Sequence, residues 1–412
     1  MSKANEHKSG YKHTPLGWIP ENWSVLYLCE IILEARLGGN YENAEANNGI
    51  PVIKMGNIAR GKINIDLVQS LPIDSEYNKE DILKKGDLLF NTRNTLDLVG
   101  KVAIWNNELP LALYNSNLLR LKFKEEFVDN NIYMNLVFNS YYGLKQLRAF
   151  AIGTTSVAAI YGRDLEHFKC LIPNKNEQHQ IATILSTWDE AITKTQQIIT
   201  ELKLRNKGLM QQLLTGKIRL RGFEGQWRKL HADEIFKSVS VKNKAGEQLL
   251  SATQDKGIIP RAMLEARVTM PAGDTDSFKL VEKGDFVISL RSFQGGIEYS
   301  AYRGLVSPAY TVLKPARQIN DSFYKHYFKS YDFIGHLAVA VIGIRDGKQI
   351  SYEDFSFLKL PYPDIKEQDA IAKVLDEAVR EVKLHEERLI ALQEQKKGLM
   401  QKLLTGEVRV KI

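Results

Sequence analysis

Apolar residues recur at alternating spacings of four and three along two long segments of the chain, residues 181–213 and 371–403. This heptad spacing predicts two α-helices, each with one apolar stripe, of the kind that pair as a coiled coil. A helix of roughly 37 residues spans about 55 Å, which is longer than a typical helix of a globular domain. Two ordinary amphipathic helices, each packed on its own domain, are therefore the less favoured interpretation.

The two predicted stripes match position by position, because each residue of the first has a counterpart 190 residues later. Polar residues interrupt both stripes at the same two places, Thr195 with His385 and Asn206 with Lys396. Polar seam residues lower stability but fix register and the choice of partner. The apolar seam residues that we expect to pair or to bind a partner are Ile181, Leu185, Trp188, Ile192, Ile199, Leu202, Leu209, Leu213, Ile371, Leu375, Val382, Leu389, Leu392, Leu399 and Leu403.

An internal repeat organises the whole chain. The block GLMQQLLTG at residues 208–216 returns as GLMQKLLTG at residues 398–406. The segments before the helices are less alike, although Lys-Gly-Asp and a following arginine occur in both, at residues 85–87 with Arg93 and at residues 283–285 with Arg291. Each half of the chain thus has a divergent front and a well-matched helical back.

The fronts have the pattern of short strands between turns rich in glycine and asparagine. We expect strands near residues 51–55, 62–65, 101–105 and 118–123, followed by a helical stretch at 132–150, and in the second front strands near 286–290 and 310–313, followed by a helical stretch at 323–341. The expected fold class is mixed α/β (α+β). Two similar globular domains would be separated by two long helices pairing as an antiparallel coiled coil, in a pseudo-two-fold repeat.

Composition narrows the class of protein only a little. The 56 lysines and arginines exceed the 49 acidic residues, giving a net charge of +7, which is a weak indication of a polyanionic partner. Two cysteines, Cys29 and Cys170, exclude a disulfide framework or a Cys-rich zinc site and fit a reducing compartment. We see neither a signal peptide nor a membrane span, and so expect a cytoplasmic protein.

No motif in the sequence predicts catalysis. Residues 56–62 fit most of a phosphate-binding GxxxxGK loop, but Ile63 replaces the metal-binding Ser or Thr, so a turn between strands is the better interpretation. The chain has no adjacent prolines for an amino-methyltransferase motif and no HExxH, CxxC or GxSxG pattern. The fragment Asp364–Lys366 resembles part of a nuclease site but lacks an upstream carboxylate. We therefore expect no catalytic residue, no metal and no cofactor on this chain.

Taken together, the duplicated blocks and their flanks support a family assignment. Pro173 and Pro363 each precede a Glu-Gln helix entry, and Trp-containing segments at residues 18–23 and 222–227 open the two fronts. In this layout the chain resembles the specificity subunit of type I restriction-modification enzymes. The segments are then a flexible N-terminal tail (1–16), target-recognition domain 1 (17–172), conserved helical region 1 (173–216), target-recognition domain 2 (217–362) and conserved helical region 2 (363–412).

The resemblance implies a larger assembly. Two modification (methyltransferase) subunits would bind the helical regions and methylate adenine with S-adenosylmethionine, and restriction (translocase and endonuclease) subunits would join with ATP and Mg²⁺. The target would be a bipartite double-stranded DNA site whose spacer is set by the helices. A complex that only methylates remains an alternative. A self-contained DNA-modifying enzyme and a scaffold that binds protein only are disfavoured.

Polar and basic turns of the fronts supply the candidate DNA contacts, since bases are read by donors and acceptors and phosphates by cations. Arg93 and Arg291 rank first because they occupy equivalent places, while solvated turn residues or local ion pairs are the alternative for every candidate. Asn57 and the turn at residues 153–156 are further possibilities. The candidates are Arg93, Asn94, Asn91, Arg60, Lys62 and Lys101 in the first front and Arg291, Gln294, Arg345 and Lys348 in the second.

Overall fold

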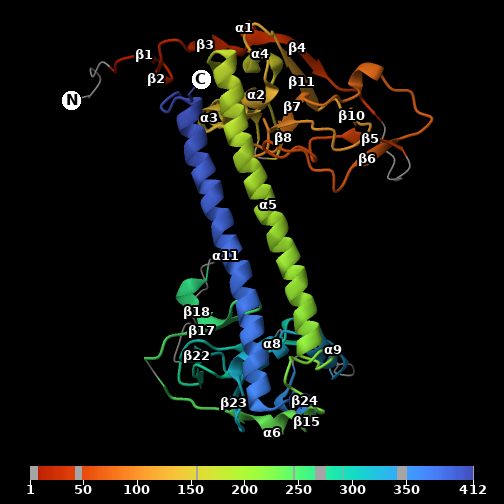
Figure 1. Ribbon diagram of the computed structural model, residues 1–412, viewed down its shortest axis with the longest axis vertical. Coiled ribbons are helices and arrows are strands. Elements are labelled where there is room, and N and C mark those ends of the chain that lie inside the picture. The colour runs from red at the N-terminus through yellow and green to blue at the C-terminus, as the bar shows by residue number, and fades with distance from the viewer. Residues whose placement is uncertain are drawn as a thin grey trace. The chain divides into compact units, whose positions relative to one another are not determined.

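The computed structural model describes residues 8–41, 49–154, 156–244, 246–264, 275–290, 292–340 and 350–411. The chain divides into two compact units: unit 1 combines residues 1–194 with 389–412, and unit 2 is residues 195–388. Each unit holds one globular domain together with part of both long helices, α5 (Lys175–Leu213) and α11 (Ile365–Leu404) (Figure 1).

Both predicted long helices form, with 39 residues in α5 and 40 in α11. They run antiparallel within each unit. In unit 1, Lys396 near the end of α11 forms an ion pair of 2.6 Å with Asp189 near the start of α5. In unit 2, the Asn206 side chain donates to the Ala378 carbonyl at 2.7 Å, close to an ion pair of 2.6 Å between Arg205 and Glu381. The predicted antiparallel pairing is confirmed.

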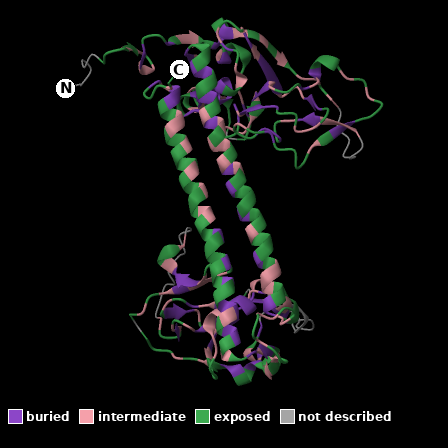
Figure 2. Cartoon of the chain, in the orientation of Figure 1, coloured by how far each residue is buried: buried purple, intermediate pink, exposed green. Residues whose placement is uncertain are grey.

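The heptad stripe forms the contact between the helices. Its core positions, such as Leu185, Ile192 and Leu375, are buried, and every other predicted stripe residue is buried or half-buried (Figure 2). Two of the polar interruptions, Asn206 and Lys396, make the hydrogen bond and the ion pair described above. These polar positions are therefore satisfied across the pair, as a register-fixing role requires.

The domain of unit 1 is built around a four-stranded antiparallel sheet in the order β4-β11-β7-β9, with α2 and α3 packed in the same hydrophobic core. Smaller sheets β10-β5-β6 and β12-β13-β8 extend from it. The elements are β1 (Tyr11–Thr14), β2 (Gly17–Pro20), β3 (Ser24–Tyr27), α1 (Leu28–Ile31), β4 (Ile32–Leu37), β5 (Gly49–Ile53), β6 (Gln69–Pro72), η1 (Lys79–Asp81), β7 (Leu88–Asn91), β8 (Arg93–Asn94), β9 (Val102–Ile104), β10 (Leu113–Tyr114), β11 (Leu118–Phe123), α2 (Asn131–Asn139), α3 (Tyr141–Phe150), β12 (Ile152–Gly153), β13 (Ala158–Ala159), α4 (Gly162–Leu165) and β14 (Lys169–Ile172).

The domain of unit 2 repeats this plan around the sheet β16-β23-β20-β21 and an aromatic core that includes Phe236, Phe286 and Phe328. The elements are β15 (Arg228–His231), α6 (Ala232–Ile235), β16 (Phe236–Val239), β17 (Leu250–Thr253), β18 (Gly257–Pro260), η2 (Arg261–Met263), β19 (Lys279–Val281), β20 (Phe286–Ile288), α7 (Ser292–Gly295), β21 (Glu298–Tyr299), β22 (Gly304–Val306), β23 (Thr311–Pro315), α8 (Asp321–Tyr327), α9 (Tyr331–Ala340), α10 (Tyr352–Ser356) and β24 (Lys359–Tyr362). The mixed α/β class and the two-domain repeat are confirmed.

The shared Lys-Gly-Asp sequence forms the same turn before a central strand in both units. The carboxylate of Asp87 accepts the backbone N–H of Lys84 at 2.8 Å, and that of Asp285 accepts the N–H of Glu282 at 2.8 Å. Each aspartate also faces a cation on the neighbouring strand. The Lys-Gly-Asp part of the similarity between the fronts thus reflects a shared turn.

One predicted strand was wrong, and both predicted helical stretches are divided into two helices. Residues 62–65 form no strand, since Ile63 makes only an isolated bridge with Ile58. The predicted helix at 132–150 is two helices, because Ser140 leaves the helical conformation and its hydroxyl accepts the N–H of Gly143 at 3.0 Å as the N-cap of α3. The second predicted helix, at 323–341, is likewise divided, into α8 and α9.

A buried glutamate closes each unit at the start of a long helix. In unit 1, Glu177 is fully buried and accepts hydrogen bonds from the Trp23 indole at 2.9 Å and the Arg409 guanidinium at 2.7 Å. Trp23 lies at the start of the domain and Arg409 follows α11, so one carboxylate joins three distant parts of the sequence.

Unit 2 has the same cluster. Glu367, which is 2% exposed, accepts from the Trp227 indole at 2.9 Å and from the Arg219 guanidinium at 2.6 Å. A buried carboxylate is tolerated only when paired and hydrogen-bonded, so the Trp and Arg partners are required by the burial.

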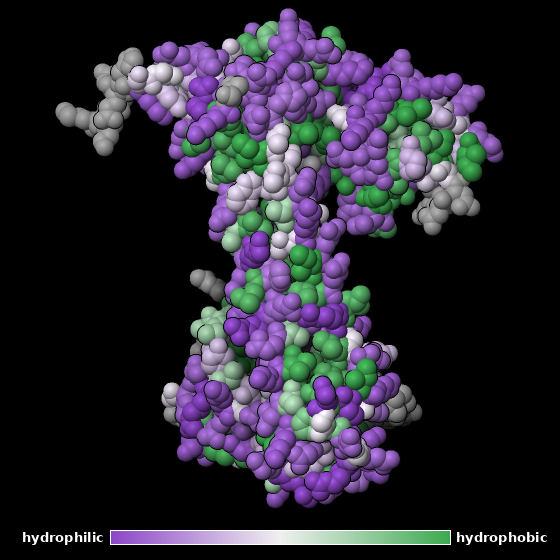
Figure 3. All heavy atoms as spheres, viewed as in Figure 1, coloured by the Kyte–Doolittle hydropathy of each residue, from purple (hydrophilic) through white to green (hydrophobic). Residues whose placement is uncertain are grey.

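The visible surface of the chain has the mainly polar character that is usual for a globular protein (Figure 3). Hydrophilic residues cover most of the visible face (Figure 3), and no helix of the described part of the chain is both long and apolar enough to cross a bilayer.

We predict that Arg219→Ala lowers the free energy of unfolding of unit 2 by about 3 kcal/mol, since it leaves the Glu367 carboxylate buried without its cation. Urea denaturation of the full chain would measure this. Arg221→Ala, at an exposed position nearby, is the control. Equal unfolding free energies for the two variants would contradict the assigned role of the cluster.

Candidate nucleic-acid interface

Three candidate segments of the first front, far apart in sequence, meet on one surface of unit 1. Strand β8 pairs with β13, which pairs with β12, so the 91–94 segment and the 152–159 hairpin form one small sheet. The turn at residues 60–62 joins them, because the Gly61 N–H donates to the Val102 carbonyl at 2.8 Å and Arg60 donates to the Asp97 carbonyl at 3.3 Å. We call this surface, formed by residues 60–62, 91–101, 152–154 and 156–159, the loop surface.

Arg93 is the most available cation of the loop surface. Its side chain is exposed and its guanidinium makes no hydrogen bond or ion pair with any residue that the structure describes. Two contacts hold its backbone in place. Arg93 pairs with Ala159 in the small sheet, and its N–H donates to the Asn91 side chain at 3.2 Å. A fixed backbone with an unpaired guanidinium is what bidentate recognition of a guanine edge or a phosphate needs.

Asn91 has a different role from the one predicted. It is fully buried at the end of β7, where its Oδ1 accepts the N–H of Arg93. Its backbone N–H donates to the Lys101 carbonyl at 2.8 Å, and its carbonyl accepts from Gly100 at 2.9 Å. The prediction that Asn91 contacts DNA directly is therefore wrong: because it is buried, it holds the two ends of the 91–101 loop in place.

Three other predicted DNA contacts of the loop surface, two lysines and one asparagine, are less available to a ligand than Arg93. Lys101 is half-buried, and burial, followed by the charge of nearby Arg60, lowers its pKa. Exposed Lys62 donates to the Thr193 hydroxyl on α5 at 3.1 Å. Half-buried Asn94 accepts the N–H of Thr95 at 2.8 Å. Cations gathered on one surface form the electrostatic footprint of a phosphate-binding site.

Asn57 is buried and acts as a staple for its own loop. Its side chain donates to the carbonyls of Asn64 at 3.0 Å and Leu67 at 2.9 Å. The possibility that Asn57 reads DNA is therefore wrong, and the loop around it is a turn with no helix after it, as the missing Ser or Thr indicated.

Gln294 is the one candidate of the second front that lies among the described residues. Arg291, Arg345 and Lys348 lie outside the described residues, and their predicted roles stay predictions. The Gln294 side chain is exposed on the short helix α7, and its predicted contact with DNA stays a prediction.

The structure adds residues to the loop surface that the sequence did not indicate. Ile152 and Val157 are 53% and 67% exposed on the hairpin, and Arg148 on α3 lies 3.8 Å from the Asp97 carboxylate. From the sequence, large apolar side chains such as Ile152 and Val157 are expected to point into the core. Only the strand pairing of the hairpin shows that they are exposed. They give the surface an apolar component beside its charge.

Among the residues that the structure describes, no group of three or more His, Cys, Asp or Glu side chains is placed so that it could hold a metal ion. The nuclease-like Asp364 has a structural role, because its carboxylate accepts the N–H of Lys366 at 3.0 Å at the start of α11.

Comparison with known proteins decides the family. The model of the type I restriction modification DNA specificity domain matches residues 20–204 and again residues 226–394. The chain belongs to this family. The resemblance inferred from the repeat is confirmed, and each unit of this type I specificity chain carries one recognition domain.

Relatives of this specificity chain are found along its whole length. It is 27% identical to a putative type I restriction enzyme MjaX specificity subunit from Methanocaldococcus jannaschii, with 98% of each chain covered. Over 52% of its length it is 31% identical to the type I restriction enzyme MjaVIII specificity subunit of the same organism, covering 51% of that protein.

Two solved structures share the fold. The HsdS subunit from Thermoanaerobacter tengcongensis matches with a TM-score of 0.51, covering 95% of this chain and 98% of that one. The type I restriction-modification S subunit from M. genitalium matches with a TM-score of 0.56, covering 95% and 97%. Both are 17% identical to the specificity chain.

We predict that Arg93→Ala weakens binding to the specific DNA site by about 1–3 kcal/mol and relaxes the preference at one base pair, because a bidentate contact to a base edge is lost. Binding to a library of sites with each base varied would measure it. An equal loss on specific and random DNA would instead assign Arg93 to a phosphate.

Lys101→Ala should weaken binding about equally on all sequences and reduce the slope of log affinity against log salt by about 1, because a phosphate contact releases counterions. Titrations at several salt concentrations would check this. An unchanged slope would place Lys101 outside the interface.

Proposed function

We propose that the specificity chain is a non-catalytic reader of a bipartite DNA target, with one half-site for each recognition domain. The observation that carries the proposal is the duplication of the whole unit: a DNA specificity domain, joined to part of the same antiparallel helix pair, occurs twice in one chain. A single duplex can occupy both only if two short segments are read.

The helix pair supports a ruler function. Buried stripe residues and polar seam contacts fix the register of α5 on α11 within each unit. Because register is fixed, the number of helical residues sets the distance between the half-sites, and the spacer between them needs no base contact.

The same helices would scaffold the modification subunits, and through them the restriction subunits. S-adenosylmethionine, ATP and Mg²⁺ would be bound by those partners, which would extract adenine from the stack and methylate it or cut the DNA elsewhere. A complex that methylates without restricting is the second form of this function. The proposed location is the cytoplasm.

The direct test is methylation-sensitive sequencing of a host genome with and without the specificity chain and its modification subunit. Two short methylated segments at a constant separation would support the proposal. Methyl transfer by the purified chain alone would contradict its non-catalytic part.

Inserting one heptad into both α5 and α11 should lengthen the preferred spacer, since seven helical residues add about 10.5 Å, or about three base pairs at 3.4 Å each. The insertions would be placed at matching points of the repeat, so that the seam stays in phase. Genome methylation by the variant complex gives the spacer directly. An unchanged spacer would rule out the ruler.

A further inference from the structure

Two large apolar side chains of the loop surface are exposed although the fold does not require it. Val157 and Ile152 are 67% and 53% exposed on the hairpin formed by β12 and β13. Single exposed aliphatic residues are common on protein surfaces, whereas several of them grouped on one face mark a contact surface. The strand pairing shows that these two residues form such a group.

Both side chains lie on the same face of the small sheet β12-β13-β8. Ile152 is directly opposite Ala159, and Ala159 is directly opposite Arg93, so these three residues form one row across the strands. Opposite residues in antiparallel strands have their side chains on one face, and so do residues two apart along a strand. Val157, two residues before Ala159, therefore shares the face of Arg93. Ala158 points to the other face and is 1% exposed, so that face is the inner one.

The tip of the hairpin is held in a fixed conformation. The Thr154 N–H donates to the Val157 carbonyl at 2.9 Å, and the Thr154 hydroxyl accepts the Val157 N–H at 3.3 Å. Gly153 has φ +139°, and a Cβ there would collide with the Val157 carbonyl oxygen, so the close approach of the two strands requires glycine. Val157 is thus presented outward by a backbone that is fixed before any ligand binds.

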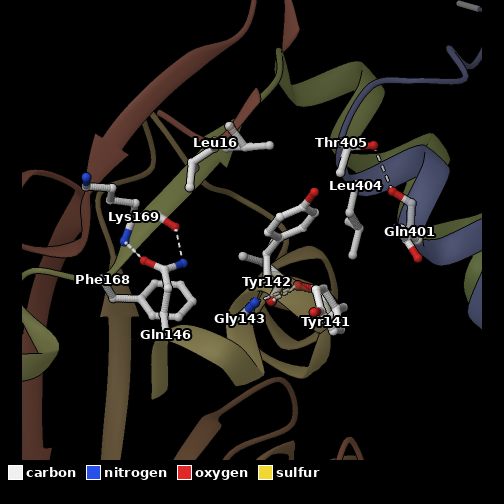
Figure 4. Close-up of a pocket in the computed structure, with 13 residues that line it drawn as sticks. Leu16, Tyr141, Tyr142, Gly143, Gln146, Phe168, Lys169, Gln401, Leu404 and Thr405 are labelled. Atoms are coloured by element: carbon white, nitrogen blue, oxygen red, sulfur yellow. Dashed lines mark hydrogen bonds between the residues drawn. The ribbon is translucent and has the colours of Figure 1, made fainter. Parts of the chain in front are cut away.

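Apolar residues also gather at a pocket between α3 and the end of α11 (Figure 4), but there the chain itself explains them. Phe168 and Leu404 line this pocket and are buried in the core of unit 1. The Gln146 side chain makes hydrogen bonds of 2.9 and 3.1 Å with the backbone of Lys169. The pocket is accounted for by the packing of unit 1, whereas the exposed face of the hairpin is not.

The charges around the hairpin favour DNA as its ligand. The loop surface contains one acidic residue, Asp97, whose carboxylate lies 3.8 Å from the Arg148 guanidinium. Its cations are Arg60, Lys62, Arg93 and Lys101. A surface with this excess of positive charge attracts phosphates. The apolar pair therefore lies where a duplex is bound, and a duplex has to offer it an apolar group.

The major groove offers one such group. Base edges present hydrogen-bond donors and acceptors there, and the C5-methyl group of thymine is the apolar exception. Ile and Val side chains have no polar atom, so covering a donor or an acceptor would remove its water without replacing the hydrogen bond. The major groove is also wide enough for a two-stranded ribbon such as the β12-β13 hairpin.

We propose that Ile152 and Val157 form a contact site for the C5-methyl group of a thymine in the half-site that unit 1 reads. The inference rests on the proposed function and adds a specificity-determining contact to it. Arg93 and the apolar pair then act from one face of one sheet, the arginine by hydrogen bonds and the pair by apolar contact.

The strand spacing limits where this thymine lies. Two neighbouring strands are about 4.8 Å apart, so the row from Arg93 to Ile152 spans about 10 Å. This corresponds to about three base pairs of about 3.4 Å each. The thymine should therefore lie within about three base pairs of the base pair that Arg93 contacts.

The test removes the methyl group from the DNA and the side chains from the protein. The complex of the specificity chain with its modification subunit would be titrated with duplexes carrying the mapped target, in which each thymine in turn is replaced by deoxyuridine. Uracil lacks only the C5-methyl group. We expect one or two replacements in the unit 1 half-site to raise the Kd about fourfold, the effect of exposing one methyl group.

Ile152→Ala and Val157→Ala should abolish this response. Each variant should bind the thymine site about fourfold or more weakly, and the variant that loses the contacting side chain should bind the thymine and deoxyuridine sites with equal Kd. Both side chains are exposed, so the Tm of the chain should change little.

Leu33→Ala is the matched control. Leu33 is 67% exposed, as Val157 is, but it lies on β4 beside the end of β11 that is remote from Asn91 and the loop surface. This variant should keep both the natural Kd and the fourfold response to deoxyuridine. Replacements in the other half-site should act equally on all variants.

The outcomes separate the two proposals. If the natural complex binds no bipartite site, the proposed function fails. If it binds one, the methyl contact alone is overturned when the unit 1 half-site has no thymine, when no replacement changes the Kd, or when the response persists in both hairpin variants. Equal weakening on all sequences without a deoxyuridine response would also overturn it, and would assign the pair to insertion between base steps.

Discussion

A single carboxylate buried at the beginning of each long helix connects the parts of each unit. Glu177 and Glu367 each take one hydrogen bond from a tryptophan that opens a domain and an ion pair from an arginine that follows the other helix. An unpaired charge at such depth would be costly, so the domain, the start of one helix and the end of the other are stable only together. The position of each domain on its part of the helix pair is fixed by this requirement.

The loop surface of unit 1 depends on a second, smaller constraint. The segment from Asn91 to Lys101 leaves the central sheet, and the buried side chain and backbone of Asn91 tie its two ends together. This leaves the Arg93 guanidinium without an internal partner among the described residues, on a backbone that is held in place. Function and stability are thus divided between nearby residues: the buried one orders the loop, and the exposed one remains available to a ligand.

Much of the fold could be predicted from periodicity. The heptad stripe specified both long helices and their seam, because seam burial repeats over many turns and no short-range effect competes with it. The repeat specified two similar domains. Local structure was harder to predict from the sequence. Residues 62–65 alternate between polar and apolar like a strand, but the Asn57 side chain donates to the carbonyls of Asn64 and Leu67 and closes this segment into a loop. The candidate turns were found because polar turns are visible in sequence, whereas burial of Asn91 depends on the strand pairing around it.

The division of the chain into units also sets an order for its synthesis. Unit 2 is continuous, so all of it has been made before the last 24 residues, 389–412, are added. Unit 1 begins first and is completed last, since Arg409 and the buried Leu403 and Leu404 arrive only at the end. Until then the first recognition domain has an uncovered apolar surface and a Glu177 without its arginine. A premature stop close to the C-terminus would therefore damage the domain nearest the N-terminus, and chaperones would be needed most by the half that is translated first.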